Sequence, residues 1–210
     1  MQNAITKDKN DRATVDQVLD PRTLIILHKL IQLEKINVMH GCISTGKEAN
    51  VYLADGRCKE FSTSEMLPEG DPNLEYAIKI FKTSILIFKD RARYVEGEFR
   101  FRKGHCKGNP RKMVKLWAEK EVRNLKRICQ SGKIRAPWPY FLKNNVIIME
   151  FIGTDSVAAP RLKDAVIGTE DSLEAAHLYE ECLIMMRNLY QTCKLVHGDL
   201  SEYNLLYHNK

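Results

Sequence analysis

A single amphipathic helix, predicted over residues 109–130, places the strongest constraint on the fold of this chain. Asn109 is a favourable N-cap residue, and Gly132 follows where a helix would end. The segment before this helix, "YAIKIF" (76–81), alternates as a strand does, and the segment after it, "NVIIMEFIG" (145–153), is typical of a buried strand. A helix that must bury its apolar face beside such strands indicates an α+β fold.

Four further segments precede this helix. A helix with a break near its proline is predicted over residues 13–36, and a hairpin around a glycine turn over residues 41–56. The polar segment 57–75 carries two prolines and is predicted to be a loop insertion. The basic segment 82–108 is irregular, and we expect much of it to be mobile. The first part of the chain is therefore dominated by strands.

The last part of the chain is predicted to be helical. Residues 170–195 have apolar side chains at spacings of three and four, which predicts a helix with one buried stripe. The stripe comprises Ala176, Tyr179, Leu183, Met186, Tyr190 and Cys193. Strands followed by helices in this order indicate two lobes within the α+β class.

Composition excludes several classes of protein. No apolar run approaches the roughly 18–20 residues that a membrane span needs, and the polar first twelve residues do not resemble a secretory signal. The six cysteines are scattered without a C-x-x-C pair, which favours reduced thiols over zinc ligands or disulfides. We therefore expect no membrane association and a location in the cytoplasm, with the nucleus as a second compartment.

Positive charge is concentrated in the middle of the chain. The whole chain has a net charge of +6, but residues 79–135 contain 18 Lys and Arg and only 5 Asp and Glu, a net charge of +13. Such a block favours partners that carry phosphate, either a nucleotide or RNA. An ordinary solvated surface of mixed charge would give the same composition, and both interpretations stay open.

A lysine in the strand and a glutamate in the helix form a candidate pair. Lys79 lies between two isoleucines, so its side chain points opposite to theirs, either to solvent or towards a partner. On a helical wheel Glu121 falls in the middle of the apolar stripe, whereas Glu119 falls on the charged outer face. A carboxylate on a buried face is costly unless it is paired. Glu121 is therefore the candidate partner of Lys79, and the alternative is a glutamate that reaches outward from the edge of the stripe.

Two short motifs have weak individual signals. "STGKEANVY" (44–52) contains one glycine and does not match either common phosphate-binding pattern, although a turn of this composition can present free N–H groups to phosphate. "HGDLSEYN" (197–204) places Asp199 and Asn204 five residues apart, which is the spacing of the kinase catalytic loop. A carboxylate at the first position can orient the attacking hydroxyl, and an amide oxygen at the second can bind Mg²⁺.

The order of these features is more specific than any one of them. A glycine-containing hairpin, a strand lysine, a helix glutamate, a second strand, a long helix and D-x4-N follow one another as in protein kinases. "ISTGKEANVY", "FKTSILIFKDRARYV", "GEFRFR", "NPRKMVKLWAEKEVRNL" and "LVHGDLSEYN" also resemble the signatures of the RIO atypical protein kinases. This resemblance extends over residues 40–210, and the fourth segment is most similar to the first RIO subtype.

The resemblance implies a fold and an activity. The fold is a protein-kinase-like two-lobe fold of RIO type with an incomplete C-terminal lobe. The implied activity is phosphorylation of serine or threonine, or hydrolysis of ATP, and it would require ATP and Mg²⁺. The implied role is in maturation of the small ribosomal subunit. The implied partners are ATP, ribosomal RNA and assembly proteins of the small-subunit precursor, and no DNA is expected. Residues 1–39 would be a tail and helix, residues 40–150 the N-terminal lobe and residues 151–210 part of the C-terminal lobe.

The resemblance also assigns roles to particular residues. It implies a set of nucleotide-binding residues in the glycine hairpin, the strand, the helix and the hinge: Ser44, Lys47, Val51, Lys79, Glu121, Met149, Glu150 and Ile152. Asp199 would be the catalytic aspartate and Asn204 a magnesium ligand, while His197 has a structural role.

This chain departs from the family pattern at two points. Gly198 stands where the family usually has alanine. The second metal-binding aspartate of the family lies on a strand after the asparagine, and the chain ends at Lys210 before any such residue. We therefore expect a fragment of a kinase. The alternative is a catalytically incomplete module that binds nucleotide and ribosomal RNA.

Overall fold

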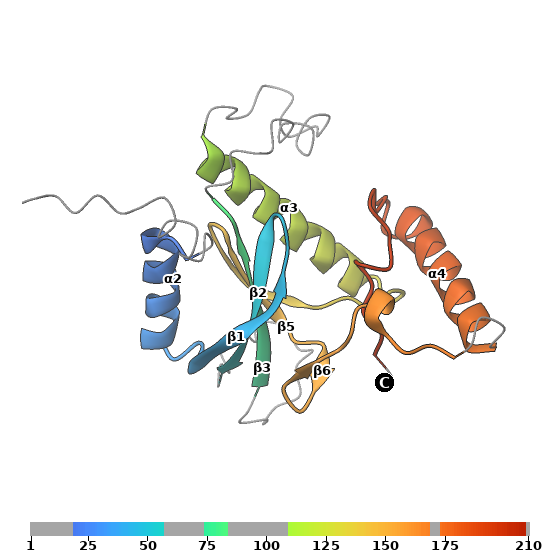
Figure 1. Ribbon diagram of the computed structural model, residues 1–210. Coiled ribbons are helices and arrows are strands. Elements are labelled where there is room, and N and C mark those ends of the chain that lie inside the picture. Colours follow the sequence, from blue (N-terminus) through green and yellow to red (C-terminus); the bar gives the residue numbers. More distant parts are fainter. Residues whose placement is uncertain (1–18, 57–73, 84–108, 169–172, 209–210) are drawn as a thin grey trace, which may run out of the picture.

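The computed structural model describes residues 19–56, 74–83, 109–168 and 173–208 (Figure 1). Along the chain its elements are α2 (Pro21–Gln32), β1 (Val38–Thr45), β2 (Ala49–Gly56), β3 (Leu74–Phe81), α3 (Pro110–Gln130), β4 (Pro139–Lys143), β5 (Val146–Glu150), β6 (Gly153–Thr154), β7 (Val157–Ala158), the 3₁₀ helix η4 (Leu162–Asp164) and α4 (Leu173–Gln191). None of the helices in these ranges has the length and apolar character needed to span a lipid bilayer.

A five-stranded antiparallel sheet forms the centre of the N-terminal part. Its strand order is β1-β2-β3-β5-β4, and α2 and α3 lie on opposite faces, at the left and upper right of the sheet in Figure 1. Alternation along β3 explains the two faces, because Ile78 and Ile80 pack in the cluster that contains α2, whereas Phe81 packs in the cluster that contains α3. Lys79 points to the same side as Phe81, towards α3.

The predicted α+β class and the predicted positions of most elements are confirmed. The hairpin, the β3 strand and the helix that begins after Asn109 are all present, and Asn109 caps α3 through two backbone N–H groups of the first turn. No sequence pattern indicated β4, and β3 begins at Leu74, inside the predicted loop. Residues 57–73 and 84–108 lie outside the described residues, so the predicted loop and mobile segment stay predictions there.

The N-terminal helix is shorter than predicted. Pro21 is its first residue rather than an internal break, because Asp20 caps the helix and proline suits the first turn. The helix ends at Gln32 rather than Ile36, since Glu34 has a φ of 53° and turns the chain towards β1. Residues 13–18 of the predicted helix lie outside the described part of the chain.

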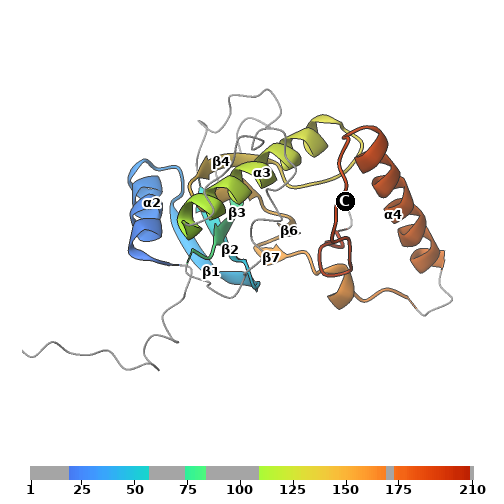
Figure 2. The ribbon, with the colours of Figure 1, turned by 90° about the horizontal axis from the view of Figure 1, so that it is seen from above.

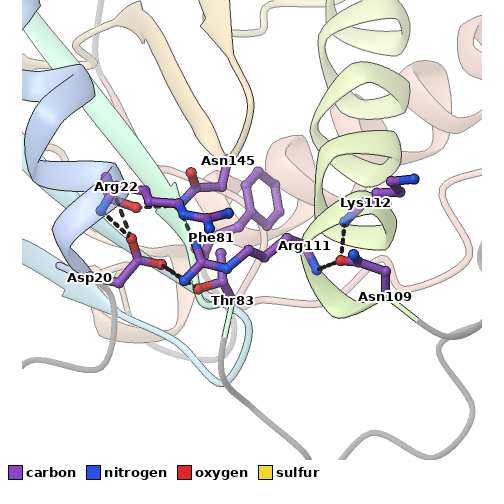
Figure 3. Close-up of polar contacts among 9 residues, drawn as sticks. Asp20, Arg22, Phe81, Thr83, Asn109, Arg111, Lys112 and Asn145 are labelled. Carbon is purple, nitrogen blue, oxygen red and sulfur yellow. Dashed lines mark hydrogen bonds and ion pairs between the residues drawn. The ribbon is translucent and has the colours of Figure 1, made fainter.

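Asp20 joins three elements at one end of the sheet (Figure 3). Besides capping α2, its carboxylate accepts a hydrogen bond of 2.7 Å from the Thr83 hydroxyl and lies 3.2 Å from the Arg111 guanidinium at the start of α3. Burial alone would raise the pKa of Asp20, but hydrogen bonds from Thr83 and the helix N-terminus, with the charge of Arg111, lower it below its usual value. Nearby, the Asn145 amide donates to the Thr23 hydroxyl and the Phe81 carbonyl.

The C-terminal part begins with the short β6–β7 hairpin and continues through η4 to α4. Figures 1 and 2 both place α4 beyond the end of α3, away from the sheet. The segment after α4 returns to η4, where the Leu162 N–H donates to the Leu205 carbonyl at 2.8 Å and the Tyr207 N–H to the Pro160 carbonyl at 2.8 Å. Arg161 and Leu206 also form an isolated β-bridge.

The predicted buried stripe on α4 is wrong, although the helix itself is present. Tyr179 and Tyr190 are 67% and 68% exposed, and of the predicted stripe only Cys193, beyond the end of the helix, is buried. The less exposed side chains lie one residue earlier and repeat with the same spacing: Ala175, Leu178, Cys182 and Met185, which are half-buried, and Leu189, which is buried. Both stripes are apolar, so periodicity alone could not distinguish them.

Candidate active site

The strand lysine and the helix glutamate form an ion pair in the sheet–helix layer. Lys79 Nζ lies 2.7 Å from one carboxylate oxygen of Glu121 and 2.9 Å from the other, so the ammonium group donates to both. The two side chains are 26% and 29% exposed, and Lys79 Nζ also lies 5.1 Å from the centre of the Phe81 ring. The predicted pairing is therefore confirmed, and an outward-reaching glutamate is wrong.

The glycine hairpin lies beside this ion pair. In the sheet register Val51 of β2 is opposite Lys79 of β3, and Ser44 of β1 is opposite Val51. Lys47 lies in the turn between β1 and β2. Gly46 precedes it, and an added Cβ there would lie 3.0 Å from the Ala49 carbonyl oxygen. Glycine therefore allows a tight turn between β1 and β2, beside the end of β3.

The predicted hinge, Met149, Glu150 and Ile152, spans the end of β5. Met149 packs against the cluster that contains α3, and Glu150 is the last residue of the strand. The backbone N–H of Glu150 donates to the Trp138 carbonyl at 2.9 Å, and its carboxylate accepts from the Trp138 N–H at 3.1 Å. Ile152 accepts a hydrogen bond from the Ala159 N–H at 2.9 Å, which closes the base of the β6–β7 hairpin. These bonds hold the segment in one conformation.

The Glu150 carboxylate also acts on its neighbours. Burial first, and the Glu150 charge second, raise the pKa of the Cys129 thiol to about 11. The same two causes raise the pKa of the Tyr140 hydroxyl. Both groups therefore stay protonated near neutral pH.

The aspartate and the asparagine of the catalytic-loop motif are brought together. The Asn204 amide nitrogen donates to the Asp199 backbone carbonyl at 2.7 Å and to its carboxylate at 3.1 Å. The Asp199 N–H donates to His197 Nδ1 at 3.3 Å, which agrees with a structural role for His197. Gly198 has a φ of 78°, a conformation that glycine adopts more easily than alanine.

The two side chains have the donor atoms that magnesium requires. With its nitrogen directed at Asp199, the Asn204 amide leaves its oxygen available, and the carboxylate supplies further oxygens. Magnesium takes one or two such protein ligands and completes its octahedron with water and phosphate oxygens. Asn204 therefore fits a magnesium site as the residue that would hold the ion, with the Asp199 carboxylate beside it.

Comparison with known proteins gives the family. The model of the RIO domain matches residues 50–210. The chain belongs to the RIO family. A serine/threonine-protein kinase rio1 of Dictyostelium discoideum is 54% identical over 96% of the chain, and RIO1 of Saccharomyces cerevisiae is 52% identical over 97%. Human RIO3 is 41% identical over 96% of the chain, so this RIO domain is more similar to the RIO1 kinases.

The matched proteins are longer than this chain. The RIO chain spans 32% of the Dictyostelium relative and 43% of the yeast relative, which is less than half of either protein. A crystal structure of the Rio2 kinase of Chaetomium thermophilum, determined as an ADP/Mg²⁺-phosphoaspartate complex, matches with a TM-score of 0.58 at 19% identity. The structural match covers 86% of this chain and 44% of the Rio2 chain. This structure supports the kinase-like fold.

The RIO domain therefore presents its predicted residues as two groups. Lys79 and Glu121 belong to the sheet and α3, whereas Asp199 and Asn204 follow α4. Within the described residues no hydrogen bond joins the groups directly. The Arg127 guanidinium of α3 donates to the Cys193 carbonyl at 3.4 Å, just before the catalytic-loop motif, and Figures 1 and 2 show this segment beside the end of α3.

Two features of the RIO site were not predicted from the sequence. Lys163 Nζ lies 4.6 Å from the centre of the Tyr203 ring, one residue before Asn204, and the Lys163 N–H donates to the Glu202 carbonyl. Nothing in the local sequence indicated this contact, because it joins η4 to a segment about forty residues later. Lys82, which contacts the glycine turn, follows Lys79 by three residues, and its position just after the strand was the only available signal.

Proposed function

We propose that this RIO protein transfers the terminal phosphoryl group of Mg-ATP to serine or threonine hydroxyls, or to water. The ion pair between Lys79 and Glu121 carries the proposal, because kinases need a strand lysine held by a helix glutamate to position the α- and β-phosphates. The names of the RIO1 relatives, all serine/threonine-protein kinases, support it, as does the ADP/Mg²⁺ complex of the Rio2 kinase.

Each residue has a distinct task in this proposal. Lys79 binds the phosphates, and Glu121 directs its ammonium group. Asp199 accepts the proton of the attacking hydroxyl or water, and Asn204 holds Asp199 in place through two hydrogen bonds. The Asn204 amide oxygen would hold magnesium, which when bound would neutralise the charge on the phosphates. The hinge residues Met149, Glu150 and Ile152 would lie beside the adenine ring.

The decisive experiment measures phosphoryl transfer from labelled Mg-ATP by the complete protein. Asp199→Asn should lower the rate by at least about 100-fold, because a positioned general base contributes that much or more. Asp155→Asn is the matched control, since this exposed residue lies in the β6–β7 turn at a φ of 51° that asparagine tolerates. Equal rates in wild type and Asp199→Asn would refute the proposed role of Asp199.

We also propose that the protein acts on precursors of the small ribosomal subunit, in the cytoplasm and nucleus. The basic character of α3 supports RNA as a partner, since seven of the basic residues of the central block lie on this helix: Arg111, Lys112, Lys115, Lys120, Arg123, Lys126 and Arg127. Ribosomal RNA binding should then weaken steeply as salt is raised, because bound phosphates release counterions.

An RNA- and nucleotide-binding module without catalysis is the second candidate function, favoured by the same basic residues of α3. The two candidates differ in one result. Asp199→Asn should leave RNA binding unchanged under both, but only the kinase or ATPase loses turnover. An affinity for RNA that does not respond to salt would count against an electrostatic RNA surface on α3.

A further inference from the structure

Lys82, just after β3, makes two hydrogen bonds to the turn between β1 and β2. Its Nζ donates to the Gly46 carbonyl at 2.7 Å, and its backbone N–H donates to the Glu48 carbonyl at 2.8 Å. The Gly46 N–H donates in turn to the Ala49 carbonyl at 2.9 Å. The turn residue Lys47 is therefore flanked on both sides by backbone groups that Lys82 holds.

The strand end that carries Lys82 is itself anchored. Three residues earlier, Lys79 is bound to Glu121 on α3, and one residue later the Thr83 hydroxyl is bound to Asp20 at the start of α2. Phe81 is buried between them. Lys82 thus connects the glycine turn to a part of the sheet that both flanking helices hold in place.

The side chain of Lys82 has no competing ionic partner in the described ranges. Its ammonium group makes its hydrogen bond to a neutral backbone carbonyl, whereas Lys79 is bound to a carboxylate. The hydrogen bond restrains the turn, and fixing the long side chain costs about 2 kcal/mol of rotamer entropy before any ligand binds. Fixing the turn in advance reduces the entropy that a ligand must overcome on binding.

We propose that Lys82 is a positioning residue that holds the glycine turn over the phosphates of the bound nucleotide. It can have this role only if the nucleotide proposed above binds beneath the turn. Lys82 acts through the Gly46 carbonyl and so sets the direction of the neighbouring N–H groups, which are the phosphate donors that such a turn offers.

The experiment compares Lys82→Met, Lys82→Arg and the control Lys143→Met in the full chain. Lys143 is an exposed lysine at the end of β4, so its replacement removes the same charge away from the turn. Binding of fluorescent Mg-ADP should weaken about tenfold in Lys82→Met, as expected for a lost charged hydrogen bond. Binding of adenosine should not change. Lys82→Arg should recover most of the ADP affinity, and Lys143→Met should equal wild type.

Amide hydrogen exchange of residues 45–49, measured without nucleotide, tests the same role independently. Exchange should become about tenfold faster in Lys82→Met, while β5 exchanges as in wild type. Unchanged exchange in the turn would overturn the role of Lys82. If ADP binds more weakly while exchange in the turn is unchanged, the positioning role is also overturned, and Lys82 contacts the phosphate directly instead. If wild type binds no ADP, the proposed nucleotide site fails, and the exchange result alone still decides whether Lys82 holds the turn.

Discussion

Lys79 and Glu121 should be coupled by about 1–2 kcal/mol in the free energy of unfolding. A hydrogen bond between charged groups is worth about 1.5–3 kcal/mol, and here the ammonium group makes two, at 2.7 and 2.9 Å. Each side chain remains more than a quarter exposed, so water screens the pair and reduces the value. The expected coupling corresponds to a factor of about 5–30 in the folding equilibrium.

A double-mutant cycle measures this coupling. Lys79→Met, Glu121→Gln and the double variant would be unfolded in urea while tryptophan fluorescence is followed. The two tryptophans of the chain, Trp117 on α3 and Trp138 before β4, both lie in the sheet and helix layer and therefore report on its unfolding.

The pair between Lys115 and Glu119 is a matched control on the same helix. Its atoms are 3.8 Å apart, its side chains are 54% and 36% exposed, and an i,i+4 pair of this kind contributes about 0.2–0.5 kcal/mol. The cycle for Lys79 and Glu121 should therefore give a clearly larger coupling than the control cycle. Equal couplings would refute the view that this ion pair joins the sheet to α3.

Three other changes should have defined effects. Asp20→Asn should lower the free energy of unfolding by about 1–2 kcal/mol at pH 7, since it removes the ion pair with Arg111 and one of the two acceptor oxygens, although asparagine can still cap the helix. The pKa of Asp20 is lowered in the folded state, so the carboxylate contributes fully to the free energy of unfolding above its unfolded pKa. This contribution is lost as the pH falls through the folded pKa, and urea midpoints measured between pH 6 and pH 3 would show the loss. The Cys129 thiol, with a pKa of about 11, should react with iodoacetamide at pH 8 far more slowly than the exposed Cys42, because on the order of a thousandth of it is thiolate. Leu189→Ala should destabilise α4 by about 2 kcal/mol, and Leu183→Ala by less than about 1 kcal/mol, in thermal melts followed by circular dichroism.

Each of these expectations has a result that would contradict it. A urea midpoint for Asp20→Asn that falls with acid as steeply as that of wild type would mean that other carboxyl groups cause the acid sensitivity. Equal labelling of Cys129 and Cys42, resolved by peptide mass spectrometry, would show that the burial of Cys129 is lost in solution. If Leu183→Ala were as destabilising as Leu189→Ala, α4 would bury the stripe that the sequence predicted.

Local sequence carried enough information for most elements of the RIO domain. Asn109 and Gly132 marked the two ends of α3 through capping, which depends only on neighbouring residues. The position of Glu121 within an apolar stripe gave its pairing with Lys79, because an unpaired carboxylate on a buried face is unfavourable. β4 was missed, since a five-residue strand beginning at a proline has little periodicity of its own.

The pairing of distant segments came only from the tertiary structure. Asp20 could be recognised as a helix cap, but its bonds to Thr83 and Arg111 depend on how α2 and α3 approach the sheet. Lys82 reaches Gly46 because β2 and β3 are adjacent in register, which places the turn beside the end of β3.

The sequence alone determined the class of fold, the order of its main helices and strands, and the spacing of Asp199 and Asn204. It did so because caps, turns and apolar periodicity act over a few residues. The tertiary structure decided which of two apolar stripes on α4 is covered, and which lysine holds the glycine turn. Both depend on contacts between segments far apart in the chain, and identical local patterns can satisfy more than one such arrangement.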